Sequence, residues 1–377
     1  MFLNALKMII VPLIVSSIIV GIASIEQDGS FARMGGKTLA YYIITSTIAI
    51  TIGLVLVMMF QPGLIDNVPA KEVLGLHADT AKVTEKVSDA SSGDIAGIFL
   101  RMIPPNIVHA AAQGQMLGLI FFSLLFGYLI AQLRSELKQN MQHFFEGVFQ
   151  VMMKMTDIVM KFAPIGVFAL VANIVATSGI EVFIPLAKFF FIVLAALAIH
   201  MFIVMPLLLV AIGRVKPTKH FSVMSPALLT AFSTSSSSAT LPITIECVED
   251  RAGVSNRTSS FVLPLGATIN MDGTALYECV AALFIAQAYG LALGFAEQFT
   301  VVVLALMTSI GVAGIPAASL VAITIILGAM GLPLEGIGLI LAVDRVLDMC
   351  RTAVNVFSDS CGAVIIARSE GEQTNLV

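Results

Sequence analysis

The chain has 377 residues, of which 58% are hydrophobic and 12% are charged, and its formal net charge is −4. Soluble domains hold about 45–50% apolar and about 25% charged residues, so this composition excludes an ordinary soluble domain and predicts one polytopic membrane domain. Without a basic run or a tryptophan, the sequence also argues against a nucleic-acid partner. The four cysteines and five histidines lack the spacing of a zinc site, and the cysteines are expected to be reduced and buried.

Five long apolar segments are expected to cross the membrane as helices. A spanning helix needs about 20 largely apolar residues, and an isolated strand cannot satisfy its backbone in lipid. The segments that meet this requirement are 1–25, 39–60, 115–133, 149–178 and 182–213. The first lacks the basic leader of a cleavable signal peptide, so it too is assigned as a span.

Residues 61–114 are expected to form an extramembrane loop with short helical pieces, because they are rich in proline and charge. Within this loop, residues 61–100 hold six acidic residues and three lysines, a net charge of −3. The segment 211–220 holds three basic residues and no Asp or Glu. The positive-inside rule places that segment in the cytoplasm, and counting spans back places the loop outside.

Two later regions are expected to enter and leave the membrane on one side. Residues 219–250 form two short apolar arms around a polar run from Ser233 to Ser238. Residues 298–330 repeat this pattern around a tip of small residues from Ser309 to Pro316. Each arm is too short to cross a bilayer, so both regions predict re-entrant helical hairpins.

A polar-interrupted span follows each hairpin, at 260–290 with a break at 270–274 and again at 335–367. A hairpin and a broken span, present twice, predict inverted repeats. Paired interrupted segments mark the midplane site of secondary transporters, where exposed backbone lines a cavity. The pattern therefore predicts an all-α polytopic membrane protein with a binding site between these segments.

The last span carries a polar stripe. Spacings of four, three, four and four positions put five residues on one helical face, and these are Asp344, Asp348, Arg351, Asn355 and Asp359. An ionisable group at the bilayer centre costs at least about 2.5–3.5 kcal/mol on insertion scales, which favours a functional role. The alternative is an internal salt-bridge ladder, which is expected to account for Asp344 and Arg345.

Arg351 suits a carboxylate, because its planar guanidinium can donate two parallel hydrogen bonds. Asp348 lies three residues earlier and suits an ammonium group. Together they are expected to hold both ends of an acidic amino acid. The alternative is that the two side chains pair with each other.

The break supplies Asn270, Asp272 and Thr274. An unwound turn frees backbone carbonyls, which form an all-oxygen cage with amide and carboxylate side chains. Such a cage favours a hard cation such as Na⁺ over a soft metal. Asn355 and Asp359 of the last span are expected to complete it.

Glu278 follows Asp272 by six residues on the same span. A buried carboxyl tends to hold its proton, so Glu278 is a candidate proton carrier. The alternative is a solvated residue near the outer end of the span.

Backbone N–H groups of the serine run are candidates for a substrate carboxylate, although serine runs are usually flexible linkers. The tip from Gly311 to Pro316 suits a flexible gate.

These segments resemble the dicarboxylate/amino acid:cation symporter family, which includes the excitatory amino-acid transporters and archaeal sodium–aspartate carriers. The resemblance covers nearly the whole chain, and is carried by Tyr41–Ser46, Phe162–Phe168, Ser235–Pro242, Asn270–Thr274 and Asp348–Thr352 with Asn355 and Asp359. It implies a glutamate-transporter-like fold with two re-entrant helical hairpins and inverted repeats.

The resemblance also implies a homotrimer in which a transport domain slides through the membrane like an elevator. The scaffold would be mainly 1–30 and 115–180, the transport core mainly 36–60 and 182–367, and the extracellular loop 61–114. The chain starts where the family's second helix begins, so the family's first helix is expected to be absent.

Matched position by position, the resemblance implies a substrate site and three sodium sites. The substrate site would use backbone at Ser235 and Ser237, then Thr274, Asp348, Arg351, Thr352 and Asn355, with backbone near Gly314 and Ile315 closing over it. One sodium would lie among Gly266, Asn270, Asn355 and Asp359, and another among Tyr42, Thr45, Ser46, Asn270 and Asp272. A third would use backbone near Thr268, Ser309, Ile310 and Val312.

Two departures from the archaeal members bear on mechanism. Ser235 stands where those members carry an arginine, and Arg345 of the last span is expected to partner Asp348 during the cycle instead. Glu278 stands where they carry a glutamine, and an acid there resembles the proton-coupled mammalian carriers.

Asp348 and Arg351 together favour an acidic amino acid, because C4-dicarboxylate members lack the aspartate and neutral amino-acid members lack the arginine. The predicted function is secondary active symport of L-glutamate or L-aspartate with sodium, and with protons through Glu278. Sodium is a co-substrate, and no cofactor or enzymatic activity is expected. The predicted location is the cell membrane, as a multi-pass protein of a bacterial inner membrane. The alternatives are a C4-dicarboxylate or neutral amino-acid carrier, an ion channel, and an intramembrane enzyme, which the lack of a nearby His or Lys base disfavours.

Overall fold

The protein is described from a computed structural model that covers residues 2–23, 29–74, 103–112, 116–162, 183–311 and 318–377, with scattered positions within 163–182. Residues 75–102 of the expected 61–114 loop lie outside the described residues, as do Val312, Gly314 and Ile315. Of the Phe162–Phe168 motif, the structure describes Phe162, Ile165 and Phe168. The described chain is mostly α-helix, which confirms the predicted class.

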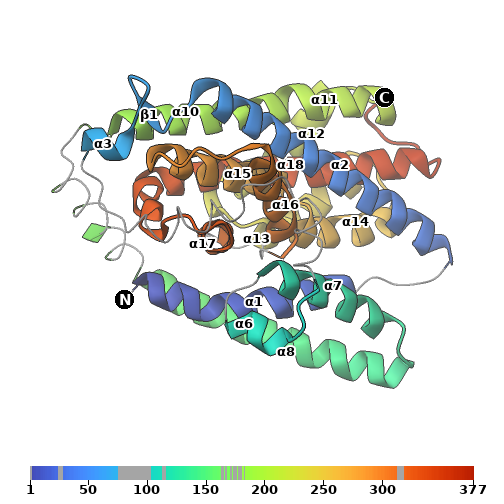
Figure 1. The fold of residues 1–377 in the computed structure, drawn as a ribbon. Coiled ribbons are helices and arrows are strands. Elements are labelled where there is room, and N and C mark those ends of the chain that lie inside the picture. Colours follow the sequence, from blue (N-terminus) through green and yellow to red (C-terminus); the bar gives the residue numbers. More distant parts are fainter. Residues whose placement is uncertain are drawn as a thin grey trace.

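Four helices lie together along one side of the molecule (Figure 1). They are α1 (Phe2–Ala23), α6 (Ile107–Ala112), α7 (Met116–Ala131) and α8 (Ser135–Lys161). α1 packs along both α7 and α8, with Ile19 against Ile130. Gly127 permits this approach, because an added Cβ would lie 3.0 Å from the Cβ of Ile22. Small residues thus bring α7 close to α1.

The other long helices gather around one buried helix. That helix is α15 (Asp272–Ala288), which is buried almost throughout. It contacts α2 (Gly29–Phe60), α10 (Phe183–Ile199), α16 (Phe295–Gly311) and α18 (Ile337–Ser369). Gly53 of α2 faces Val280, where an added Cβ would come within 2.8 Å of the valine side chain. α15 therefore forms the centre of this group.

Two pairs of helices flank the two tips that the sequence predicts, and the members of each pair pack against each other. The first pair is α12 (Pro217–Thr234) and α13 (Ser237–Glu246), and the second is α16 and α17 (Ala318–Met330). Between α12 and α13, Ser235 adopts a left-handed backbone with φ of 53°. Ser236 then caps α13, because its side chain accepts a hydrogen bond from the Ala239 N–H. The serine run is therefore a tight turn between two helical arms.

The break at 270–274 is confirmed, because α14 (Asn256–Ile269) ends there and α15 begins at Asp272. The second interruption, expected within 335–367, is wrong: α18 is one continuous helix of 33 residues. Its polar residues fall on one face, so they interrupt the apolar pattern without interrupting the backbone.

Two helix boundaries and one short hairpin differ from what the apolar pattern predicts. α2 begins ahead of residue 39, where Arg33 and Lys37 pair with Glu370 beyond the end of α18. α8 begins ahead of residue 149, because its first turns form an amphipathic helix that apolarity alone does not detect. A short hairpin, β1 (Leu64–Ile65) and β2 (Val68–Pro69), precedes α3 (Ala70–Leu74). It turns at Asp66 and Asn67, both with positive φ, residue types that favour such turns.

Three helical stretches among the described residues are long and apolar enough to cross a membrane, and they are Arg33–Phe60, Phe183–Gly213 and Asn256–Ala288. The second runs through α10, a π-helical turn from His200 to Val204, α11 (Met205–Leu208) and a further π-helical turn. Phe191, Phe202 and Leu207 along it are exposed, as expected of a surface that faces lipid.

Candidate substrate and cation site

The polar stripe of α18 is buried inside the protein, and each of its five residues is at most 5% exposed. Arg351 pairs with two carboxylates of its own helix. Its Nη1 lies 3.1 Å from Asp344 Oδ1, and its Nη2 lies 2.9 Å from Asp348 Oδ1. In this structure Arg351 pairs with Asp348, and Asp344 takes part in an internal salt bridge. These are the two alternatives that the sequence leaves open for the stripe.

Tyr277 of α15 completes the surroundings of Arg351. Its hydroxyl donates a 2.8 Å hydrogen bond to Asp344 Oδ1, and its ring lies 4.1 Å from the guanidinium carbon. Arg345, in contrast, is exposed and lies 3.8 Å from Asp348 Oδ2. Arg351 is thus a desolvated cation held between carboxylates and an aromatic face, where a substrate carboxylate would compete for its donors.

Asn355 joins this stripe to the start of α15. Its Oδ1 accepts the Gly273 N–H at 2.8 Å, and its Nδ2 donates to Thr274 Oγ1 at 3.0 Å. Gly273 is required here, because an added Cβ would lie 2.7 Å from the Arg351 carbonyl oxygen. Thr352 donates to the Asp348 carbonyl within α18. The predicted substrate residues of α15 and α18 therefore form one cluster.

The serine turn contributes two further features. The Ser235 N–H bonds the Ala231 carbonyl, so that amide is already used in this state. The Ser235 Oγ is buried and has no hydrogen-bond partner among the described residues. Ser237 begins α13, and a helix N-terminus favours an anion.

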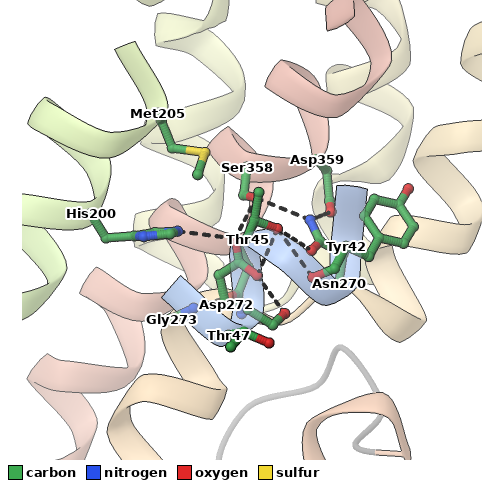
Figure 2. Close-up of polar contacts among 12 residues, drawn as sticks. Tyr42, Thr45, Thr47, His200, Met205, Asn270, Asp272, Gly273, Ser358 and Asp359 are labelled. Carbon is green, nitrogen blue, oxygen red and sulfur yellow. Dashed lines mark hydrogen bonds and ion pairs between the residues drawn. The ribbon is translucent and has the colours of Figure 1, made fainter. Parts of the chain in front are cut away.

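Asp272, the carboxylate of the break, lies in a cluster of polar side chains (Figure 2). Ser46 donates to its Oδ1 at 2.6 Å, and Ser358 donates to its Oδ2 at 2.7 Å. His200 Nε2 lies 3.0 Å from Oδ2, and Thr45 lies 3.3 Å from Oδ1. All these side chains are buried, so oriented polar groups of the protein surround the carboxyl group of Asp272.

Asn270 joins the same cluster from the other side. Its Nδ2 donates to Asp359 Oδ1 at 2.9 Å and to Ser358 Oγ at 3.1 Å. Gly266 packs directly against Asp359, because an added Cβ would lie 2.5 Å from Asp359 Oδ1. Tyr42 of α2 donates to the Val262 carbonyl at 2.6 Å. The residues predicted for two cation positions are thus brought together from α2, α14, α15 and α18.

The third predicted cation set is only partly described. Thr268 donates to carbonyls of its own helix, as does Ser309 on α16. Helices α14 and α16 pack together, and Ile310 is partly buried and packs against the apolar core. Val312 lies outside the described residues.

Glu278 is fully buried, so its interpretation as a solvated residue is wrong. Its Oε2 lies 2.7 Å from the hydroxyl of Thr308 on α16. Its Oε1 has no hydrogen-bond partner among the described residues. The carboxyl therefore stands between α15 and α16, removed from water.

His200 and Ser358 are contributors to the site that sequence reasoning missed. His200 starts the π-helical turn, a local irregularity that often marks functional positions. Ser358 precedes Asp359 and follows Asn355 by three residues, so the spacing of the stripe could have included it.

Within the described ranges, no group of three or more His, Cys, Asp or Glu side chains could hold a metal ion. Of the cysteines, Cys247, Cys279 and Cys361 are buried as expected, whereas Cys350 is only half-buried.

Comparison with known proteins identifies relatives along nearly the full chain. The sequence profile of the sodium:dicarboxylate symporter family matches residues 1–369. The "Proton/sodium-glutamate symport protein" of Geobacillus stearothermophilus is 36% identical over 371 residues, which are 98% of this chain and 86% of the relative. The "Proton/glutamate-aspartate symporter" of Escherichia coli is 37% identical over 375 residues, covering 98% and 84%. "Excitatory amino acid transporter 3" of Homo sapiens is 36% identical over 416 aligned positions, covering 97% and 77%.

Proposed function

This chain belongs to the sodium:dicarboxylate symporter family, and from that premise we propose that it imports L-glutamate or L-aspartate together with sodium and protons. The observation that carries the proposal is Arg351, buried in α18 between Asp344 and Asp348. A buried guanidinium with aligned carboxylates suits a substrate that bears both a carboxylate and an ammonium group. The names of the relatives, which specify glutamate and aspartate, support this choice.

Substrate binding is proposed to work by exchange of partners. The side-chain carboxylate of the substrate replaces the aspartates on Arg351, and Asp348 then takes the substrate ammonium group. Thr274, Thr352 and Asn355 hold the remaining polar atoms, with backbone at Ser235 and Ser237. Backbone near Gly314 and Ile315 closes over the bound molecule. Asp348 exchanges the guanidinium for the ammonium group and Asp344 keeps the hydrogen bond from the Tyr277 hydroxyl, so neither buried carboxylate loses all of its polar partners.

Sodium is proposed to bind among the oxygen atoms around the break. One position uses Gly266, Asn270, Asn355 and Asp359, another uses Tyr42, Thr45, Ser46, Asn270 and Asp272, and a third uses Thr268, Ser309, Ile310 and Val312. Carboxylate, amide, hydroxyl and carbonyl oxygens are the ligands of hard cations. The hydroxyls that now donate to Asp272 keep lone pairs that a cation can use.

Glu278 is proposed to carry the proton. Among the described residues, Glu278 has no basic partner at hydrogen-bond distance. A carboxyl buried in this way between helices would be costly as an anion, so a neutral form is favoured while it faces the protein interior.

The proposed architecture follows the family expectation. Regions 219–250 and 298–330 act as re-entrant hairpins in a fold with inverted repeats. Residues 1–30 and 115–180 form the scaffold of a homotrimer, and 36–60 with 182–367 form a core that moves like an elevator past it. The close packing of α1, α7 and α8 on one side, and of the remaining long helices around α15, supports this division. The proposed location is a cell membrane, as a multi-pass protein of a bacterial inner membrane.

The second candidate is a carrier for C4-dicarboxylates or neutral amino acids. Asp348 beside Arg351 disfavours it, because a dicarboxylate offers no ammonium group and a neutral amino acid offers no second carboxylate. An uncoupled ion channel is the candidate of another class.

Uptake of labelled L-aspartate into proteoliposomes tests the proposal. With an inward sodium gradient we expect concentrative uptake, and without it none. Succinate and serine, supplied in competition, should inhibit weakly. Sodium entry that does not depend on substrate would identify a channel, and strong inhibition by succinate would identify a dicarboxylate carrier.

A further inference from the structure

The hydroxyl of Thr308 makes more short contacts than it has hydrogens to donate. Its Oγ1 lies 2.7 Å from Glu278 Oε2, 2.8 Å from the Leu304 carbonyl and 3.3 Å from the Ala305 carbonyl. A threonine hydroxyl has one hydrogen and two lone pairs. A carbonyl oxygen cannot donate, and one hydrogen shared between two acceptors makes two weakened, bent bonds, so both shortest contacts are full hydrogen bonds when Glu278 supplies a hydrogen of its own.

This geometry describes a chain of two hydrogen bonds in one direction. The neutral carboxyl of Glu278 donates from Oε2 to Thr308, and Thr308 donates to the Leu304 carbonyl. When Glu278 has released its proton to water, the hydroxyl must rotate and donate to the carboxylate instead. The Leu304 carbonyl then no longer accepts a hydrogen bond from the Thr308 hydroxyl. The threonine gives up no proton in this exchange, and only its hydrogen changes direction.

We infer that Thr308 is a positioning residue through which helix α16 responds to the protonation of Glu278. The contact bridges α15 and α16, which pack against each other. Thr308 lies in the last turns of α16, next to the tip that is proposed to close over the substrate. A change in hydrogen bonding at this point therefore acts on the contact between the two helices. The inference rests on the proposed proton coupling at Glu278 and adds the residue that transmits it.

The surroundings of Glu278 leave Thr308 as its nearest polar partner. Both side chains are at most 1% exposed, and Glu278 Oε1 has no partner among the described residues. Arg351 of α18 is the charged group that acts on Glu278, and Cys279 is its titratable neighbour on α15. The sequence of α17 contains no titratable residue, and the one lysine of α10, Lys188, reaches toward the Leu64 carbonyl.

The other elements packed against α15 place their titratable groups elsewhere. On α2, Arg33 and Lys37 pair with Glu370, and the tyrosines at 41 and 42 donate to backbone carbonyls. α3 carries one lysine and one glutamate near the hairpin. α16 itself has one acidic residue, in its first turn at the end opposite Thr308.

The test is the pH dependence of L-aspartate uptake in proteoliposomes at saturating sodium and substrate. Thr308→Val removes the hydroxyl and keeps the side-chain volume. A bond to the ionised carboxylate is stronger than a bond to the neutral acid, so losing the hydroxyl weakens the ionised form more. We expect the pH of half-maximal uptake to rise by about one unit, a tenfold change in proton concentration. Thr308→Ser, which keeps the hydroxyl, should restore the wild-type profile.

Thr324 of α17 provides the matched control. It is a buried helical threonine whose hydroxyl donates to the Leu320 carbonyl at 2.8 Å. Thr324→Val should leave the pH profile unchanged, and an equal shift there would overturn the inference. If Thr308→Val keeps the wild-type pH profile while Glu278→Gln loses its pH dependence, proton coupling at Glu278 holds and the role of Thr308 is wrong. If uptake by the wild type does not depend on pH, the proposed proton coupling is wrong, and the inference fails with it.

Infrared spectroscopy gives a readout that does not depend on the valine variant being stable. The wild-type protein should show a protonated carboxyl band that is absent in Glu278→Gln, at the frequency of a hydrogen-bonded acid. The band should be retained in Thr308→Ser. A band at the frequency of an acid without a hydrogen bond would overturn the inference.

Discussion

Asn270 in the break between α14 and α15 donates from Nδ2 to Asp359 Oδ1 of α18 across 2.9 Å. This bond turns the amide oxygen of Asn270 toward Thr45, which lies 3.3 Å away. Thr45 is also 3.3 Å from Asp272 Oδ1. Two side-chain oxygens from the break therefore converge on one hydroxyl of α2, and oxygen atoms are the ligands that hard cations prefer.

Asp272→Asn is expected to weaken sodium dependence selectively. The substitution keeps the size of the side chain and removes the charge that Ser46, Ser358 and His200 now surround. Loss of a charged ligand should raise the sodium concentration for half-maximal uptake by about tenfold or more, equivalent to at least ~1.4 kcal/mol. Asp250→Asn, at an exposed position, serves as the control. Equal sodium dependence in wild type and Asp272→Asn would refute the assignment.

Arg351→Ala is expected to abolish binding of acidic substrates. The alanine removes the carboxylate donor and leaves Asp344 and Asp348 buried without their cation. Truncating one member of a buried charge pair costs about 2–5 kcal/mol, so the affinity for L-aspartate should fall at least ~30-fold. Binding is measured calorimetrically on the purified protein in saturating sodium. Arg345→Ala, six positions earlier on α18 and exposed, should change the affinity little.

Much of the site follows from sequence because it depends on local geometry. The spacing of Asp344, Asp348, Arg351, Asn355 and Asp359 predicts one buried face, and the structure has that face. A polar turn inside an apolar run predicts the helix break, which lies at the expected position. These inferences need only the helical period and the cost of burying charge.

The rest depends on packing between segments far apart in the chain. His200 reaches Asp272 across 72 positions, and Thr308 reaches Glu278 across 30. Nothing in the local sequence around either residue specifies its partner. The early start of α2 is of the same kind, because its basic residues find Glu370 more than 330 positions away. The continuity of α18 does not follow from the apolar pattern, because a polar face along one helix interrupts that pattern in the same way as a break in the backbone does.

His200→Ala is expected to weaken sodium binding through Asp272. Its Nε2 lies 3.0 Å from Asp272 Oδ2, and losing that contact leaves the carboxylate less firmly oriented. Removing such an outer partner typically lowers metal affinity by about 10–100-fold, so a rise of about tenfold in the half-maximal sodium concentration is expected. His200→Gln, which can still donate a hydrogen bond, should recover part of the loss. His220, a buried histidine bonded to Ser360, provides the control variant His220→Ala. A similar loss in both alanine variants would contradict a specific role.

Glu370→Gln is expected to destabilise the protein in a pH-dependent way. Hydrogen bonds from Lys37 and Arg33, at 2.5 and 2.6 Å, lower the pKa of Glu370 beyond the end of α18. A carboxyl whose pKa is lowered by folding adds stability above its unfolded pKa of about 4.3, and this stability is lost as the pH falls through the folded value. Wild type should therefore exceed the variant by about 0.5–1 kcal/mol at pH 7, and the two should converge below about pH 4.

Thermal unfolding in detergent at a series of pH values measures this difference, and raising the salt concentration should shrink it because both ion pairs lie near water. A double-mutant cycle with Lys37→Met separates the ion pair from other effects of either change. A difference that stays constant from pH 7 to pH 3 would show that Glu370 stabilises the end of α18 by packing and not by its charge.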